Sequence, residues 1–234
     1  MGKASRLARG FAAAALLAAA ASASARDYPA VSVDYFVLFD RTCAEMAREP
    51  LDEAAVKELQ ERLGAFRDFW SKEEPVLMGA VVPVTGVPFR FAETRAALAT
   101  CGFQSMSLPL IVNMRPYLAA TAKGRVAPMV DFSNTLFHEA MHRYVADSIR
   151  ELPGETTPLL RKYAAENVAV RNHMHLFAIE RLVYRRIGRE KDLDAVVATE
   201  NTFRGAQAFQ RARAIVAEEG AEALVKELSG GRRP

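Results

Sequence analysis

The 234-residue sequence has few histidines and cysteines, no long hydrophobic run and almost no excess of one charge sign. It contains four histidines and two cysteines. The most apolar stretch, near the start of the sequence, spans about a dozen residues, whereas a transmembrane helix needs roughly 20. The sequence is therefore not that of a multi-pass membrane protein. Hydrophobic residues make up 50%, too many for a disordered chain, and no internal repeat marks a second domain. We expect one globular domain over residues 26–234.

The sequence also lacks the basic excess that is typical of nucleic-acid-binding proteins. Lysine and arginine number 31 and aspartate and glutamate 28, so the formal net charge is +3. Lys3, Arg6 and Arg9 account for this excess, and they lie in a segment that we expect to be removed. We therefore expect no nucleic-acid partner.

Residues 1–25 have the pattern of a secretory signal peptide. A basic start precedes an alanine- and leucine-rich run, and small residues at Ala23 and Ala25 precede Arg26. Signal peptidase accepts only small side chains at these positions, so we predict cleavage near Ala25 and a periplasmic or secreted protein. No cysteine follows closely enough to be lipidated, and we expect no stable membrane anchor.

Both cysteines, Cys43 and Cys101, lie in the predicted mature chain. An oxidising compartment favours a disulfide between them over two buried thiols. Closing a loop of this length would stabilise the fold by about 4 kcal/mol in the chain-entropy model.

The first half of the chain predicts a small sheet. Residues 31–40 alternate between apolar and polar side chains, as in a half-buried strand. Residues 51–72 follow with helical periodicity, which we expect to end at Pro75. From 75 to 130, valine-rich runs between prolines and glycines predict short strands: Val81-Val82, Val84 and Leu110-Ile111-Val112.

The second half is helical in pattern, over residues 134–150, 158–188 and 192–228, the last region as one helix or two. We therefore predict an α+β fold in which a small mixed or antiparallel sheet packs on a helical C-terminal half.

The sequence His138-Glu139-Ala140-Met141-His142 has the spacing of a metal-binding motif with a neighbouring catalytic carboxylate. Positions four apart lie on one face of a helix, so two imidazoles can bind one zinc ion. Glu139 then lies beside the metal-activated water and can act as general base.

The helix predicted over 158–188 offers the third ligand. His173, Glu166 and Glu180 share its buried side, whereas His175 points toward the arginines of the other side. If the two helices form a regular antiparallel hairpin, Glu166 lies about as far from the connecting loop as the motif histidines do, which favours Glu166 as the ligand. If the second helix is broken near Glu166, His173 reaches that same depth, measured along the helix from the loop. We predict His173 as the ligand, with Glu166 and then Glu180 as alternates; a residue that is not a ligand then orients one.

Residues 133–186 resemble the zincin metallopeptidases, and within them the gluzincin-like arrangement in which a downstream helix supplies the third ligand. The resemblance implies a peptide or protein substrate, one zinc ion and an edge strand, placed at 124–132, that pairs with an extended substrate. It also makes Tyr163 and Tyr184 candidate oxyanion donors, although aromatics at helical spacing are more often core.

These observations predict an exported zinc-dependent peptidase. The alternative is a secreted zinc-binding or scaffold protein without turnover, whose site would be closed by a fourth protein ligand. A cell-envelope binding module without a metal ion is the third hypothesis.

Overall fold

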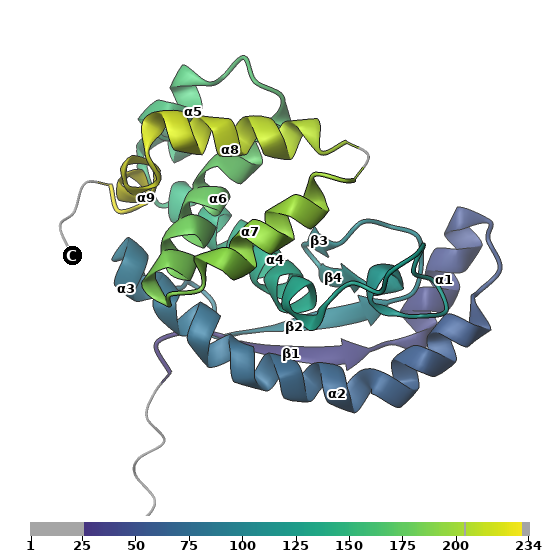
Figure 1. Cartoon of the computed structure of the whole chain (residues 1–234). Coiled ribbons are helices and arrows are strands. Elements are labelled where there is room, and N and C mark those ends of the chain that lie inside the picture. Colours follow the sequence, from purple (N-terminus) through teal and green to yellow (C-terminus); the bar gives the residue numbers. More distant parts are fainter. Residues whose placement is uncertain (1–25, 204, 231–234) are drawn as a thin grey trace, which may run out of the picture.

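The computed structural model describes residues 26–203 and 205–230, so the predicted signal peptide lies outside the described residues. The fold is α+β, as predicted: a small sheet in the N-terminal half packs on a helical C-terminal half (Figure 1). None of the described helices is long and apolar enough to cross a membrane.

The sheet is mixed and has the strand order β1-β2-β4-β3. Strands β1 and β4 pair with β2 in parallel, and β3 pairs with β4 in antiparallel orientation at the edge. The strands are β1 (Ala30–Tyr35), β2 (Glu93–Ala99), β3 (Met106–Ser107) and β4 (Leu110–Asn113).

The strand predicted over residues 31–40 is wrong beyond Tyr35, because helix α1 (Val37–Ala47) follows. The alternation continues in the sequence, but Leu38 is 72% exposed and Asp40 is fully buried. The Asp40 carboxylate accepts hydrogen bonds from the backbone nitrogen and the hydroxyl of Thr100. The burial of Asp40 therefore depends on a partner that is distant in the sequence, and local periodicity could not indicate the helix at this position.

Helix α2 (Glu53–Leu77) is confirmed, but it does not end at Pro75. A proline removes one intrahelical hydrogen bond, yet the fully buried Leu77 and Met78 anchor the turn that follows. The strand predicted from the valine run at 81–84 is also wrong. These residues lie in helix α3 (Val81–Thr85), whose first residue, Val81, is fully buried.

The disulfide between Cys43 and Cys101 is confirmed, with Cα atoms 6.1 Å apart. It joins α1 to the segment that follows β2, a strand that the sequence pattern did not single out. Ala96 and Leu98 of β2 are buried, and the strand lies between β1 and β4 in the sheet.

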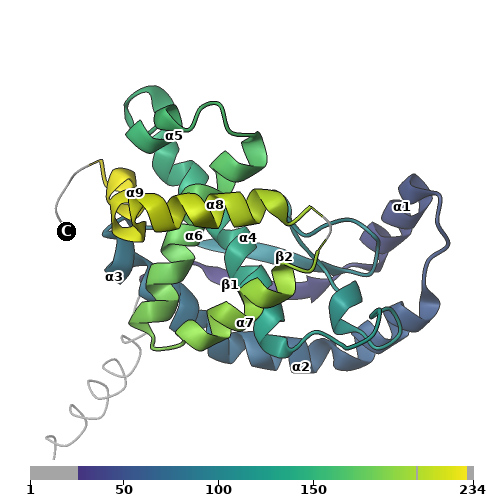
Figure 2. The same cartoon turned by 45° about the horizontal axis from the view of Figure 1, so that its top comes forward.

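The C-terminal half consists of helices, and α4, α7, α8 and α9 all pack against α6. Figures 1 and 2 show α4 beside the sheet and α6, α8 and α9 together at the end of the molecule opposite α1. The helices are α4 (Met129–Arg150), α5 (Pro158–Lys162), α6 (Val168–Arg186), α7 (Glu190–Glu200), α8 (Gln207–Glu219) and α9 (Ala221–Leu228). Short 3-10 turns occur at Met78–Ala80, Arg115–Tyr117 and Pro153–Glu155.

Three predictions for this half need correction. The helix predicted over 158–188 is broken between α5 and α6, and the region 192–228, predicted as one helix or two, consists of three helices. The edge strand placed at 124–132 is wrong, because α4 already begins at Met129. The edge of the sheet is instead β3, two residues long and therefore below the length that periodicity detects.

Candidate metal centre

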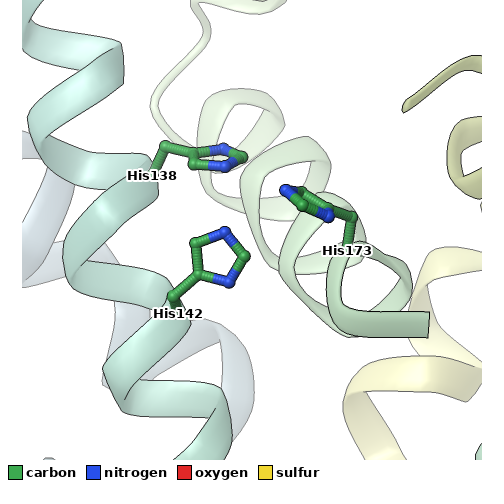
Figure 3. Close-up of side chains that lie close together, drawn as sticks. All are labelled: His138, His142 and His173. Atoms are coloured by element: carbon green, nitrogen blue, oxygen red, sulfur yellow. The ribbon is translucent and has the colours of Figure 1, made fainter. Parts of the chain in front are cut away.

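Three histidines converge where α4 faces α6. His138 and His142 come from α4 and His173 from α6 (Figure 3). One ring nitrogen of each lies within 4.8 Å of those of the other two, so the group could hold a metal ion. The structure thus places His173, which the sequence predicted as the third ligand, beside the two histidines of the motif.

The position of His173 depends on where α6 begins. The side chain of Asn167 caps this helix by accepting a hydrogen bond from the backbone nitrogen of Val170 at 2.8 Å. The chain between α5 and α6 is therefore not helical, and the new helix begins at Val168, two residues after Glu166. This is the break under which His173, rather than Glu166, reaches the depth of His138 and His142.

Hydrogen bonds to Nδ1 orient two of the rings. Nδ1 of His138 lies 2.9 Å from Oε1 of Glu180, and Nδ1 of His173 lies 2.6 Å from the carbonyl oxygen of Ala169. A carboxylate and a carbonyl can only accept, so Nδ1 carries the proton in each pair and Nε2 remains for a metal ion.

Glu180 is held by an ion-pair network of its own. It is fully buried, and its second oxygen lies 3.8 Å from the guanidinium of Arg213. Arg213 also pairs with Glu200 and stacks on the ring of Phe177, with 3.7 Å to the ring centroid. Helices α7 and α8 thus support the carboxylate that orients His138.

Aromatic side chains cover the histidine rings. The ring centroid of Phe209 lies 4.4 Å from that of His173 and 6.1 Å from that of His138. The ring centroids of Phe177 and His173 are 5.2 Å apart. An apolar shell of this kind limits solvent access and strengthens electrostatic interactions within the site.

Glu139 lies beside the histidines and is only 7% exposed. Its Oε2 accepts a hydrogen bond from the hydroxyl of Ser107, on the edge strand β3, at 2.7 Å. Sequence reasoning missed Ser107, since nothing in the local pattern indicates that this serine faces α4.

Burial and neighbouring charges together set the protonation states of the three histidines. Burial, and then the charge of His138, lower the pKa of His142 to about 2 and that of His173 to about 4. Both rings are neutral at pH 7, which is the form that binds metal ions. Burial also disfavours the charged form of His138, but the hydrogen bond and charge of Glu180 outweigh it and raise its pKa.

The same burial raises the pKa of Glu139. The charge of His138 and the hydrogen bond from Ser107 oppose this effect without cancelling it. A carboxylate of this kind is suited to accept a proton and to release it again.

Neither alternate residue is part of the histidine group. Glu166 accepts a hydrogen bond from Nε of Arg211 at 2.8 Å, on the side of α8. Glu180 instead orients His138, the role that we assigned to an alternate that is not a ligand.

The prediction that His175 faces the solvated arginines is wrong. Its side chain is 1% exposed, because α9 packs on that side of α6 and Thr157, the N-cap of α5, lies against the ring. Nε2 of His175 lies 2.9 Å from Oε2 of Glu227 and 3.4 Å from the Thr157 hydroxyl, which accounts for its burial.

The two tyrosines proposed as oxyanion donors are occupied elsewhere. The Tyr184 hydroxyl donates to Oδ1 of Asn134 at 3.0 Å, within the core. The Tyr163 hydroxyl donates to Glu219. Both have the structural role that their helical spacing allowed.

Comparisons with known proteins found no matching family model, no matching curated protein and no matching solved structure. The chemistry of the site therefore has to be argued from its residues. They provide three imidazole nitrogens and a buried carboxylate beside them.

Proposed function

We propose that the protein is an exported zinc-dependent peptidase, with His138, His142 and His173 as metal ligands and Glu139 as general base. The observation that carries the proposal is that the three imidazoles converge beside a buried carboxylate whose hydrogen-bond partner is a serine hydroxyl. Three nitrogen ligands with one position left for water are typical of catalytic zinc sites.

The surroundings of the histidines favour an open site over a closed one. A closed structural site needs a fourth protein ligand. Two carboxylates within residues 158–188 could supply this fourth ligand, but both are bound to other groups. Glu180 is bound to His138, and Glu166 is bound to Arg211. This supports turnover rather than the scaffold alternative.

The chain supplies the base and the geometry of the reaction. Zinc, when bound, polarises the substrate carbonyl and lowers the pKa of the attacking water. Glu139 takes the proton of that water and delivers it to the leaving amine as the peptide bond breaks. Glu180 and Ala169 hold His138 and His173 in the tautomer that leaves Nε2 free.

Export is part of the proposal. The disulfide between Cys43 and Cys101 suggests an oxidising compartment. The pattern of residues 1–25 supports the same location, in the periplasm or outside the cell. The resemblance of residues 133–186 to the zincins, with their helical ligands, supports the reaction class.

The experiment is metal analysis and peptide cleavage on the purified processed protein beside Glu139→Gln. We expect about one equivalent of zinc in both proteins and cleavage of a mixed peptide pool by the parent alone. Glu166→Gln is a matched control, since it removes a carboxylate from a neighbouring segment and should leave cleavage unchanged.

Two outcomes would contradict the proposal. Absence of zinc in the parent would remove the metal centre. Zinc in both proteins without cleavage by either would favour the secreted zinc-binding or scaffold alternative.

A further inference from the structure

A serine on the edge strand reaches the proposed base. Strand β3 is two residues long and, among the residues that the structure describes, pairs only with β4, with Ser107 opposite Leu110. The side chain of Ser107 is directed at α4, where its hydroxyl donates to Oε2 of Glu139 across a separation of 32 residues. The bond connects the sheet to the helix that contributes two of the three histidines.

This bond fixes one oxygen of a carboxylate that otherwise has rotational freedom. Glutamate has three side-chain torsions, and Glu139 is next in sequence to His138. A hydrogen bond to an ionised acceptor is about twice as strong as one between neutral groups. With Oε2 bound to Ser107, Oε1 is the oxygen that remains for the proposed reaction.

The geometry points to Ser107 as a positioning residue for Glu139, and this inference rests on the proposed function. Ser107 holds the carboxylate in the orientation from which it takes a proton, and it keeps one oxygen away from the metal centre. It acts through Glu139 and contacts no reacting atom itself. Its loss should therefore lower turnover and leave substrate binding nearly unchanged.

A neighbouring serine separates this role from simple support of the strand. Ser105 lies two residues earlier, and its hydroxyl accepts a hydrogen bond from the backbone nitrogen of Asn113 at 3.0 Å. It joins the same segment to β4 but does not contact Glu139. Ser105→Ala removes an equivalent hydroxyl from the same segment and is the matched control.

The kinetic test compares the parent with Ser107→Ala, Ser107→Thr and Ser105→Ala. The substrate is the internally quenched fluorescent peptide that the parent cleaves fastest in a mixed pool. A misplacement of about 1 Å can cost about 100-fold in rate, so we expect Ser107→Ala to lower kcat by roughly 10- to 100-fold. KM should change by less than about two-fold, Ser107→Thr should restore most of kcat, and Ser105→Ala should resemble the parent.

A second readout does not depend on activity. Crystal structures of the parent and Ser107→Ala, each with and without zinc, locate the Glu139 carboxylate directly. We expect it within hydrogen-bonding distance of Ser107 in the parent and displaced or spread over several rotamers in the variant.

An unmoved carboxylate in Ser107→Ala would overturn the inference, whether or not the parent cleaves peptides. So would an unchanged kcat, or a loss of equal size in Ser105→Ala. A parent that binds zinc and cleaves nothing contradicts the proposed function alone, and the crystal structures then still decide whether Ser107 positions Glu139.

Discussion

Nδ1 of His138 lies 2.9 Å from Oε1 of Glu180, two residues that are 42 positions apart in the chain. Helix α6 thus contributes to the histidine group twice, with His173 as a member and with Glu180 as the acceptor that orients a member on α4. The contact explains how a fully buried glutamate is accommodated beside a histidine cluster.

Replacing Glu180 with glutamine should weaken zinc binding. The amide keeps the size of the side chain but loses the charge that holds Nδ1–H of His138. Loss of such a partner typically costs about 10- to 100-fold in metal affinity, and we expect a decrease in this range. Competition against a chromophoric zinc chelator measures it. Glu166→Gln serves as the control, and an equal loss of affinity there would assign the effect to general destabilisation.

Removing any one of the three proposed ligands should abolish stoichiometric zinc binding. We expect His138→Ala, His142→Ala and His173→Ala each to fall from about one equivalent of zinc to near zero after dialysis. His175→Gln should keep its zinc, because His175 is bound to Glu227 on the far side of α6. Elemental analysis of protein shown to be folded by circular dichroism gives the answer. If His175→Gln lost its zinc while His173→Ala kept it, the third ligand would be misassigned.

Asn167→Ala should lower stability by removing the cap of α6. Loss of an N-cap side chain costs about 1 kcal/mol in the free energy of unfolding. Denaturant titration of the zinc-free protein measures this change without the contribution of metal binding. Asn167→Asp, whose side chain can accept the same hydrogen bond from Val170, should lie close to the parent. A loss as large in Asn167→Asp as in Asn167→Ala would argue against capping.

Replacing both cysteines with serine should destabilise the fold. The disulfide closes a loop with a sequence separation of 58, for which the chain-entropy model gives about 4 kcal/mol. We expect a shift of this order in the free energy of unfolding of Cys43→Ser/Cys101→Ser. The oxidised parent treated with a reductant should show a similar loss. Unchanged stability in both would mean that the bridge does not constrain the unfolded chain.

The part of the site that lies within one helix could be predicted from the sequence. The positions of His138, Glu139 and His142 follow from the period of a helix, which depends on no distant contact. His173 required the start of α6 as well, and the signal was Asn167, since asparagine is among the preferred N-cap residues. Periodicity alone runs through this position and gives one continuous helix.

The remaining features depend on contacts between segments far apart in the sequence. Ser107 reaches Glu139 only because a two-residue strand pairs at the edge of the sheet. Asp40 is buried by Thr100, and His175 by Glu227. In each case a polar side chain is hydrogen-bonded to a residue 32 or more positions away in the chain, and no local pattern contains that information.

The break between α5 and α6 also affects how the chain can change in length. The angular position of His173 is counted from the cap at Asn167, not from His142, so the intervening connection does not set the geometry of the site. We therefore expect an insertion or deletion between α5 and Asn167 to leave the rotation of His173 relative to α4 unchanged. Related chains can therefore keep all three histidines at variable spacing, and a sequence pattern with a fixed gap between the second and third would miss them.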